Sequence, residues 1–326
     1  MHRVKKVLVA AGYAVAALIA AVVLLWFGVT ARYFDFFANA GSEFLIPGLS
    51  SNWVPQGFDY MEEQDIYLMC GYMSDGTASR VYVRRGAGDE SYVNLTYPDG
   101  TAYTKHAGGI CHNGEFVYIA GDDGVDVFRL SDVLNRTEAK RIGNIPVGYE
   151  LAYCSFYDGY LLAGNFYYQG DYETPLSHRL NTPAGDENKA LITVFKADDQ
   201  AQFGIDPVPV GAVSTPGKVQ GICFTDRDEV VLSTSYSLGP SRLERHRIDT
   251  TRRANIQTAG TEVTLIYLDS STLVDRVTAP PMAEELVYKD GRVMILFESA
   301  CNAYMFGKLT RGYQVYSYLF DQEVRD

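Results

Sequence analysis

Five stretches of the chain share one order of polar and hydrophobic positions. Each begins with polar residues and usually a Gly, continues with a short apolar run and a tight polar turn, and ends with a longer apolar run. The stretches are VPQGFDYMEEQDIYLMCGY (54–72), KHAGGICHNGEFVYIAGD (105–122), YELAYCSFYDGYLLAGNF (149–166), KVQGICFTDRDEVVLSTSY (218–236) and PMAEELVYKDGRVMILFES (281–299). Short apolar runs separated by polar turns predict paired antiparallel strands, so each stretch predicts a hairpin.

Further strands are predicted between the hairpins. Runs such as SRVYVRR and GVDVFRL predict a third strand, and runs such as SYVNLTY predict a fourth. Four-stranded units that repeat every ~40 to 70 residues are typical of a β-propeller, because one small sheet cannot bury both of its faces alone. The pattern therefore predicts an all-β propeller of five four-stranded blades. A ring of six stays open if residues 241–278 hold a degenerate blade.

The two ends of the repeat array are expected to share the last blade. After FES this blade still needs two strands, and YQVYSYLF (313–320) predicts one of them. SEFLIPGL (42–49) predicts the outermost strand from the amino-terminal side. Such sharing closes the ring and covers the edges that an open array would expose.

The amino-terminal segment is a separate hydrophobic element. Residues 7–29 carry no charged side chain. A run of this length can cross a bilayer as a helix and exceeds the usual core of a cleavable signal peptide. Arg3, Lys5 and Lys6 precede it. Because basic residues stay in the cytoplasm, we expect a single-pass membrane protein with its carboxyl-terminal domain outside.

Cleavage of this segment stays open as an alternative. Small residues give possible signal-peptidase sites that end at Ala31 and Ala40, and cleavage there would release a secreted protein. The predicted domains are a cytoplasmic stub (1–6), a transmembrane anchor (7–29), a linker (30–41) and a propeller (42–326).

The amino-acid composition supports an all-β protein and argues against a nucleic-acid-binding protein. The 326 residues are 47% hydrophobic and 13% aromatic, enough for a large core. The counts of 30 Gly and 24 Tyr favour an all-β protein with many turns. With 28 basic and 40 acidic residues, the net charge is −12. Nucleic acid is therefore excluded as a partner, since binding it needs basic grooves.

Propeller topology is expected to gather the polar strand ends around one mouth of the central channel. The chain enters each innermost strand from one face of the disc, and the second strand returns to that face. The entering set is Gln56, Lys105, His106, Glu150, Lys218, Gln220, Glu284 and Glu285, and the returning set is Tyr72, Asp122, Asp123, Asn165, Ser235, Tyr236, Glu298 and Ser299. The opposite face receives short turns of ordinary composition, so the site is predicted at the first face.

Roles can be assigned within this set. His106 is the histidine predicted at the mouth, which makes it the general-base candidate. Glu284 and Glu298 would form the acid and base pair of a glycosidase if about 5 to 9.5 Å apart. The ligand-binding candidates are Gln56, Lys105, Glu150, Asn165, Lys218, Gln220 and Tyr236. The structural alternative for each residue is a hydrogen bond to neighbouring backbone or to ordered water.

Carboxylates that converge on one channel repel one another unless they are protonated, paired or bridged by a cation. Lys105, Lys218 and His106 are available to pair them. Alternatively, the oxygen atoms of Glu150, Asn165 and Glu298 would suit Ca²⁺ or Mg²⁺. The spacing of these residues matches no known ligand motif, so both explanations stay open.

A long connection in the third repeat opens onto the same face. It reads NFYYQGDYETPLSHRLNTPAGDENKA (165–190) and is rich in tyrosine. Aromatic rings beside polar groups make good contact surfaces, so the segment is a candidate lid or wall. A loop that packs its tyrosines on its own blade is the alternative.

The five cysteines predict free thiols. Cys111, Cys154 and Cys223 occupy the same strand position in three successive repeats. Equivalent points of adjacent blades should lie beyond the ~7 Å Cα separation that a disulfide allows. A bridge between Cys70 and Cys301 stays open, because the first and last blades meet. Zinc, nucleotide-binding and serine-hydrolase motifs are absent from the sequence.

Several short motifs carry a family resemblance. VPQGF, HAGGI, VQGI with STSY and SRL, PPMAEE and FES resemble a bacterial family of extracytoplasmic propellers over residues 42–320. More distantly, the repeat is similar to SMP-30/gluconolactonase and NHL-type propellers. Some of those hold a divalent metal in the channel and hydrolyse lactones. Their catalytic motifs match no positions here, so the resemblance implies the fold alone.

Two functions fit these predictions. The first is a membrane-anchored propeller that binds a small molecule, glycan or protein at the mouth face. The second is a hydrolase, lactonase-like or glycosidase-like, that uses the channel carboxylates. A hydrolase should have an open channel, converging carboxylates and at least one strongly shifted pKa. A binding protein could instead have Lys105 and Lys218 neutralising the carboxylates.

Overall fold

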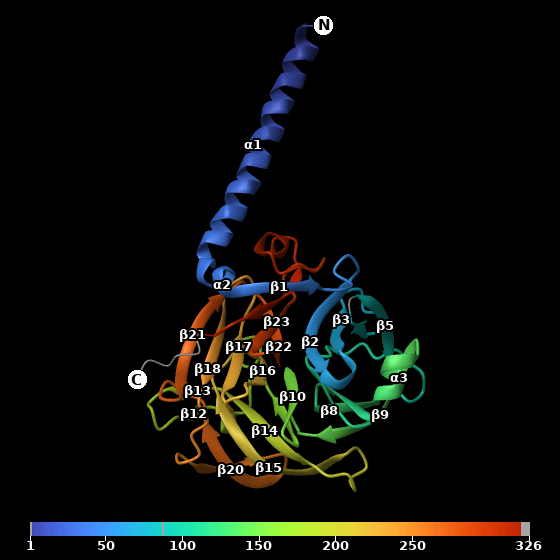
Figure 1. Cartoon of the computed structure of the whole chain (residues 1–326), viewed down its shortest axis with the longest axis vertical. Helices are drawn as coiled ribbons and strands as arrows, with labels where there is room; N and C mark the ends of the chain where they lie inside the picture. Colours follow the sequence, from blue (N-terminus) through green and yellow to red (C-terminus); the bar gives the residue numbers. More distant parts are fainter. Residues whose placement is uncertain (1, 87, 321–326) are drawn as a thin grey trace.

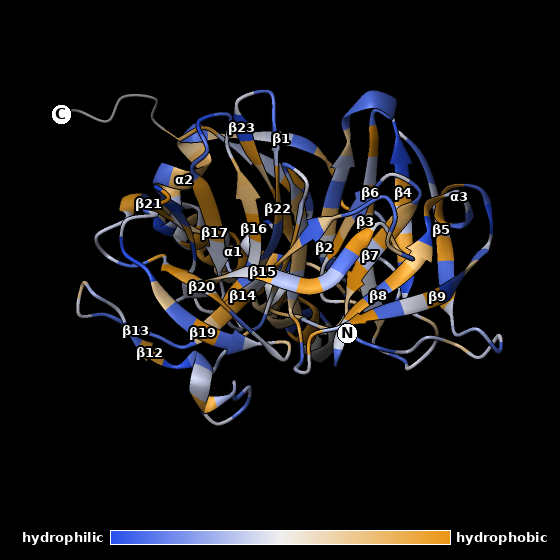
Figure 2. Ribbon diagram, turned by 90° about the horizontal axis from the view of Figure 1, so that it is seen from below, coloured by the Kyte–Doolittle hydropathy of each residue, from blue (hydrophilic) through white to orange (hydrophobic). Residues whose placement is uncertain are grey.

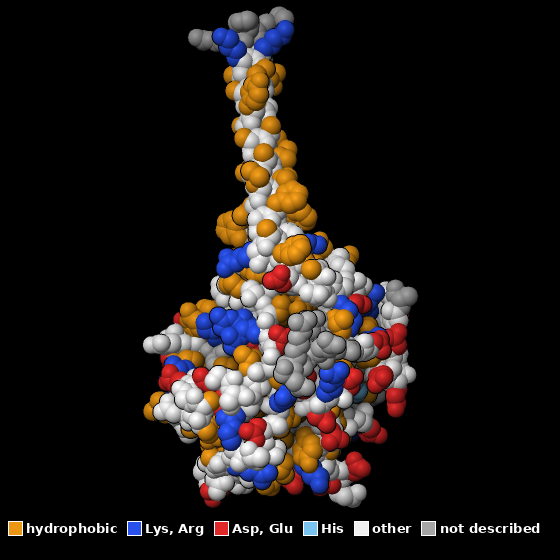
Figure 3. Space-filling model, turned by 60° about the vertical axis from the view of Figure 1, so that its left-hand side comes forward, with side chains coloured by type: hydrophobic (Ala, Val, Ile, Leu, Met, Phe, Trp, Pro, Cys, Tyr) orange, Lys and Arg blue, Asp and Glu red, His pale blue; other side chains and the backbone are white. Residues whose placement is uncertain are grey.

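A long apolar helix precedes the β-rich body of the protein. The structure is a computed structural model, which describes residues 2–86 and 88–320. Helix α1 (His2–Arg32) rises from the rim of a disc of sheets (Figure 1). Hydrophobic side chains cover most of its length in Figure 3. Its most apolar part is exposed, and only near its end does a side chain, Val29, pack against the core. By length and composition α1 is able to cross a membrane. A signal sequence near the amino terminus would have the same length and composition.

The antiparallel pairings group most strands into five four-stranded units. The first two units join into one eight-stranded sheet through a parallel pairing of their outer strands. From the innermost strand outward, the first three units are β2 (Trp53–Met61), β3 (Ile66–Met73), β4 (Arg80–Arg85) and β5 (Asp89–Thr96); β6 (Ile110–Asn113), β7 (Phe116–Ala120), β8 (Gly124–Arg129) and β9 (Glu138–Pro146); and β10 (Tyr153–Tyr157), β11 (Tyr160–Gly164), β14 (Ala190–Ala197) and β15 (Ile205–Thr215). The last two are β16 (Val219–Phe224), β17 (Val230–Thr234), β18 (Ser241–His246) and β21 (Leu273–Ala279); and β22 (Ala283–Lys289), β23 (Arg292–Phe297), β24 (Gln314–Tyr318) and β1 (Ala40–Leu45).

The innermost strands form a closed ring. β2 contacts β6, β6 contacts β10, β10 contacts β16, β16 contacts β22, and β22 contacts β2. In Figure 1 the units surround a common centre, and the edge of the disc next to α1 is formed by α2 and β1. The hydrophobic core divides into clusters that lie mainly between neighbouring units, and Figure 2 shows apolar residues concentrated on the strands. The protein is a β-propeller, as the sequence predicts.

Residues 241–278 do not form a separate four-stranded unit. β18 and β21 belong to the fourth unit, and the segment between them folds into a hairpin of β19 (Ala254–Thr258) and β20 (Thr261–Tyr267). β20 pairs in parallel with the outer strand β15 of the third unit. This hairpin therefore widens the third sheet.

Shorter elements complete the fold. They are α2 (Phe34–Asn39), η1 (Glu62–Gln64), α3 (Leu130–Asn135), η2 (Leu176–His178), β12 (Leu180–Asn181), β13 (Glu187–Asn188) and η3 (Gly307–Thr310).

The amino-terminal segment closes the last unit, as its predicted strand requires. β1 pairs antiparallel with β24 and becomes the outermost strand of the sheet. The preceding helix α2 adds Phe36, which is 0% exposed and stacks on Tyr318 at 5.6 Å between ring centroids. A chain cut after Ala40 would lack this ring. The segment predicted as a linker is thus part of the propeller core from Tyr33 onward.

We expect Phe36→Leu to lower the free energy of unfolding by about 1–2 kcal/mol, because it removes aromatic contacts and leaves a small void. Phe34, which is 65% exposed two residues earlier, provides the matched control, and Phe34→Leu should change stability by less than about 0.5 kcal/mol. Urea unfolding of the full chain in detergent, followed by the fluorescence of buried Trp53, measures both. Equal effects of the two substitutions would contradict the role given to α2.

Candidate functional site

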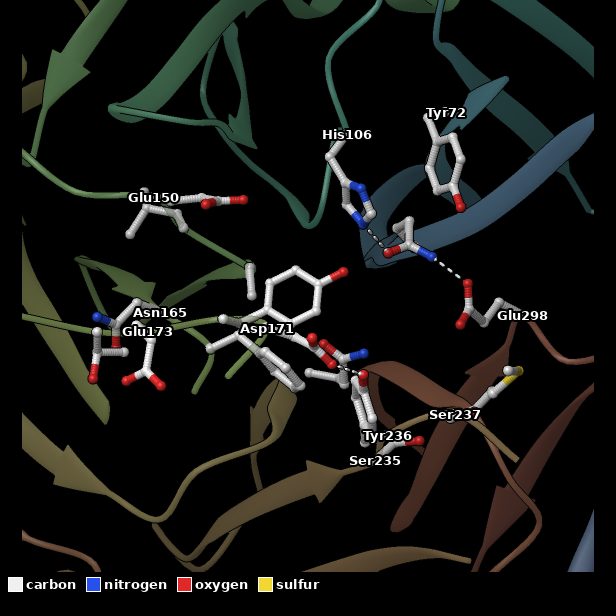
Figure 4. Close-up of a pocket in the computed structure, with 18 of the residues that line it drawn as sticks. Tyr72, His106, Glu150, Asn165, Asp171, Glu173, Ser235, Tyr236, Ser237 and Glu298 are labelled. Carbon is white, nitrogen blue, oxygen red and sulfur yellow. Dashed lines mark hydrogen bonds between the residues drawn. The ribbon is translucent and has the colours of Figure 1, made fainter. Parts of the chain in front are cut away.

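A pocket of about 360 Å³ opens at one mouth of the channel. All five units contribute to its lining, and Figure 4 shows their side chains around a common space. The polar and aromatic lining residues are Gln56, Tyr72, His106, Tyr149, Glu150, Asn165, Phe166, Asp171, Tyr172, Glu173, Thr174, Gln220, Ser235, Tyr236, Ser237, Glu298 and Tyr304. The structure therefore brings seven predicted site residues to one pocket: Gln56, His106, Glu150, Asn165, Gln220, Tyr236 and Glu298.

Bulges in the innermost strands aim two polar side chains into the pocket. Gln56 is an extra residue between the paired Pro55 and Gly57 of β2. Gln220 is the equivalent extra residue in β16. In β22 the register also shifts, across Glu284 and its neighbour. A bulge redirects the side chain of the extra residue, and bulges are common beside functional sites.

Glycine follows two of these bulges because the strands meet closely there. A Cβ at Gly57 would lie 2.6 Å from the backbone nitrogen of Ile110 in the next unit. A Cβ at Gly221 would lie 2.4 Å from Cα of Glu285. The Gln-Gly pairs of the first and fourth repeats thus combine an inward-pointing amide with a close approach of two innermost strands.

A chain of hydrogen bonds connects Glu298, Gln56 and His106 along one side of the pocket (Figure 4). Gln56 Nε2 donates to Glu298 Oε2 at 2.7 Å and to the Pro55 carbonyl oxygen at 2.8 Å. Both amide N–H groups are therefore used, so Gln56 Oε1 must accept from His106 Nε2, 2.6 Å away. His106 also stacks on Tyr72 at 4.7 Å between ring centroids.

This arrangement restricts what His106 can do. Its Nε2 carries the proton that Gln56 accepts, so only Nδ1 can take up another proton. Although the ring is open to the pocket, the surrounding protein disfavours its charged form and lowers its pKa, against the nearby Asp122 charge. The hydrogen bond to Gln56 therefore fixes a neutral His106 side chain in the pocket wall. If His106 acts as a general base, it accepts the proton at Nδ1.

Glu298 and Glu284 form a buried pair of carboxyl groups. Glu298 is 8% exposed and Glu284 is 1% exposed. Burial raises the pKa of Glu298 to about 7, although hydrogen bonds from Gln56 and Tyr304 favour its charged form. Burial and then the Glu298 charge raise the pKa of Glu284 well above its usual range. Glu284 lies behind Gln220, whose Nε2 is 3.4 Å from Glu284 Oε1, and it is not part of the pocket lining.

The predicted metal set is not brought together. Glu298 lies across the pocket from Glu150 and Asn165 (Figure 4). Both ends of the Asn165 amide are already engaged: Oδ1 accepts from the Leu191 backbone at 2.8 Å and Nδ2 donates to His178 Nδ1 at 2.9 Å. Over residues 2–86 and 88–320, no three His, Cys, Asp or Glu side chains are grouped to hold a metal ion. We therefore include no Ca²⁺ or Mg²⁺ in the proposals below.

The two lysines lie outside the pocket lining. Lys105 forms a salt bridge with Asp122. Lys218 lies over the Tyr168 ring, with Nζ 5.0 Å from the ring centroid. Lys105 thereby neutralises Asp122, which was also predicted at the mouth, and it acts electrostatically on Glu150. Neither lysine forms a salt bridge with Glu298 or Glu284, so the expected neutralisation does not extend to this pair.

Residues 166–175 form one wall of the pocket, as expected for the long connection of the third repeat. Tyr168 stacks on Tyr236 with 3.6 Å between ring centroids. The Tyr236 hydroxyl donates to Asp171 Oδ2 at 2.6 Å. Asp171 and Glu173 were not predicted from the sequence, because the tyrosines, His178 and Arg179 of this segment stood out instead. Their position in a loop directed at the mouth was the available signal.

A second cavity lies at the opposite mouth of the channel, where the sequence predicted only short turns of ordinary composition. A cavity of about 270 Å³ is lined by Cys111, Cys154, Cys223 and Glu285 together with aromatic residues. All five cysteines are buried free thiols, and Sγ of Cys111 is 3.7 Å from Sγ of Cys154. The open alternative of a Cys70–Cys301 bridge is therefore not realised.

Glu285 belongs to this second cavity rather than to the predicted mouth. Its Oε2 accepts hydrogen bonds from the backbone N–H groups of Phe58 and Ile110, both at 2.8 Å. Its Oε1 accepts from the Cys154 N–H at 3.3 Å. Burial raises its pKa well above the usual range, while the backbone bonds oppose that shift. One side chain of the fifth unit thereby joins the innermost strands of the first three.

The strand pairings and the pocket define a β-propeller with a polar site at one mouth of its channel. No protein-family model matches the chain, and no curated protein matches it. Similar solved structures include an oxidoreductase described as a glucose dehydrogenase from Thermus thermophilus, with 12% identity, a TM-score of 0.46, and 86% of this chain and 100% of that chain covered. A PQQ-bound aldose sugar dehydrogenase from Streptomyces coelicolor has 14% identity and a TM-score of 0.44, over 79% and 78% of the two chains.

Gluconolactonases, to which the sequence bears its distant resemblance, are also among the similar structures. One from Xanthomonas campestris has 11% identity and a TM-score of 0.40, over 87% of this chain and 96% of that chain. At such identities no residue role transfers from these proteins. The chemistry of the pocket has to be argued from its own side chains.

Proposed function

We propose that this chain is a membrane-anchored propeller that binds a ligand in the pocket at the channel mouth, on the outer side of the membrane. The apolar helix α1 supports the anchoring. The basic residues before that helix support the orientation. The unknown partner is a small molecule or a protruding part of a glycan or protein, since the pocket is enclosed by loops on several sides.

The observation that carries this proposal is the convergence of all five units on one open pocket. Hydrogen-bonding groups from sequence-distant loops face the same space, and Gln56, Gln220 and Tyr236 are fixed by their own partners. Side chains held in this way lose little freedom when a ligand binds. The fixed lining is thus suited to recognition.

A hydrolase is the second candidate, and the buried carboxyl pair favours it. Glu298 has the raised pKa expected of a general acid. However, Glu284 does not reach the pocket, whereas a glycosidase needs both carboxyls beside the scissile bond. The geometry supports binding better than hydrolysis by this pair. If the protein hydrolysed a lactone or a glycoside and Glu298→Gln abolished that activity, hydrolysis would be favoured over binding.

Binding can be tested by screening the full chain in detergent against neutral sugars, lactones, carboxylic acids, amines and short peptides, using ligand-observed NMR. We expect at least one class to bind, and its Kd to rise at least about tenfold in Tyr236→Ala. Tyr160, an exposed tyrosine at the start of β11 and outside the pocket lining, supplies the control, and Tyr160→Ala should bind normally. A Kd that is unchanged in Tyr236→Ala would show that the ligand binds at another site.

A further inference from the structure

We propose that the ligand of the mouth pocket carries a positive charge, as a primary amine or a quaternary ammonium group. This inference rests on the proposed binding function and specifies its ligand class. It comes from the charge of the lining, the buried carboxyl pair and the surrounding aromatic rings.

The pocket lining is acidic and has no basic counterpart. It includes the carboxyl groups of Glu150, Asp171, Glu173 and Glu298, and no lysine or arginine in the part of the chain that the structure describes. Glu173 has a partner in Arg179 beneath the wall. The other three form no salt bridge within the described residues. Lys105, which lies outside the lining, acts electrostatically on Glu150. The lining itself contains carboxyl groups and no basic side chain from Lys or Arg, so it presents net negative charge to a ligand.

The carboxyl pair needs a counter-charge that the protein does not supply. The hydrogen-bond partners of Glu298 and Glu284 are the neutral side chains of Gln56, Gln220 and Tyr304. A buried carboxylate without an opposite charge is costly, and a second carboxyl beside it adds repulsion. A cationic group at Glu298 would relieve both costs. With a neutral ligand the pair would instead avoid these costs by holding protons, as the raised pKa values of both groups indicate.

Aromatic rings surround the same space. Tyr72, Tyr149, Phe166, Tyr172 and Tyr304 line the pocket together with Tyr236. The face of an aromatic ring attracts a cation within about 6 Å, most strongly where water is excluded. The protein already shows this contact at the rim, where the Lys218 ammonium lies 5.0 Å from the ring that stacks on Tyr236. Acidic groups between aromatic faces are the surroundings that an organic cation prefers.

The overall charge of the chain acts in the same direction. A net charge of −12 raises the local concentration of cations near the surface and repels anions. Anionic ligands, such as phosphorylated or carboxylated sugars, are therefore disfavoured at this mouth. A neutral glycan could use the same hydrogen-bonding groups, and the experiment has to separate it from a cation.

Pairs of probes that differ in charge alone provide the test. Choline and its neutral isostere 3,3-dimethyl-1-butanol form one pair, and putrescine and 1,4-butanediol form another. Isothermal titration of the full chain in detergent should show at least one cation binding at least about tenfold more tightly than its neutral counterpart. Glu298→Gln should reduce that preference at least about fivefold. Glu115→Gln, which removes an exposed carboxylate in the β6–β7 turn, should leave it unchanged.

Each outcome decides the proposal. A cation preference that depends on Glu298 supports it, and so does a preference that high salt weakens. Equal binding of both members of every pair would overturn it. If the cations fail while neutral sugars bind in a Tyr236-dependent way, the ligand class is wrong and the binding function stands. If nothing binds, both proposals fall.

Discussion

Glu285→Ala is expected to destabilise the propeller by roughly 4–6 kcal/mol, the largest effect we predict for a single substitution. The carboxyl group of Glu285 satisfies the backbone N–H groups of Phe58, Ile110 and Cys154, which belong to three different units. Alanine leaves these buried donors without partners and opens a void among the innermost strands. Urea unfolding of the full chain in detergent, read from Trp53 in a Trp26→Phe background, gives the free energy directly.

Glu285→Gln separates the contribution of the hydrogen bonds to stability from that of the side-chain volume, because glutamine has nearly the same volume as glutamate. The glutamine carbonyl can still accept from Phe58 and Ile110, so only the bond from Cys154 is lost, and we expect a loss of about 1–2 kcal/mol. A similar cost for the alanine and glutamine variants would contradict the view that Glu285 ties the ring together through backbone donors.

The second large effect is a pH dependence that Glu298 imposes on stability. Its pKa is raised to about 7 by burial, above the 4.5 of a free glutamic acid. The folded state thus holds the proton more tightly than the unfolded state between these values. The sign follows: this contribution to stability is complete below about pH 4.5 and is lost as the pH rises through 7. The loss amounts to about 3 kcal/mol.

Comparison with Glu298→Gln isolates the contribution of the Glu298 and Glu284 pair, because titrating groups away from this pair act equally on both proteins. The free energy of unfolding of the variant, minus that of the wild type, should increase by about 3 kcal/mol from pH 4.5 to pH 8. Glu115→Gln should show a constant difference over the same range, since its carboxylate is exposed. A difference for Glu298→Gln that stays flat with pH would show that Glu298 ionises as readily in the folded protein as in the unfolded chain.

The propeller and much of the mouth were predictable because both depend on local patterns that repeat. Alternating apolar runs fixed the hairpins, and ring topology then placed the strand ends at one face. The Gln-Gly pairs at Gln56 and Gln220 were visible as a repeated signal. Their cause, a bulge that turns the glutamine inward, depends on the register of the partner strand and cannot be read from one strand alone.

The remaining details depended on contacts between distant segments. Two adjacent residues illustrate this: Glu284 lies behind the mouth pocket, whereas Glu285 points to the opposite cavity, and the register shift in β22 decides which goes where. Likewise, Lys105 pairs with Asp122, one of the carboxylates predicted at the mouth, and forms no salt bridge with Glu284 or Glu298. Asp171 reached the pocket through a loop whose path follows from the stacking of Tyr168 on Tyr236.

The attachment of α1 at the rim has a geometric consequence. The helix leaves the disc beside the fifth unit and runs away from its edge, so the ring stands upright beneath the helix (Figure 1). In any bilayer that α1 crosses, the axis through the two mouths would run along the membrane surface. Molecules would then reach either mouth by moving parallel to the membrane surface.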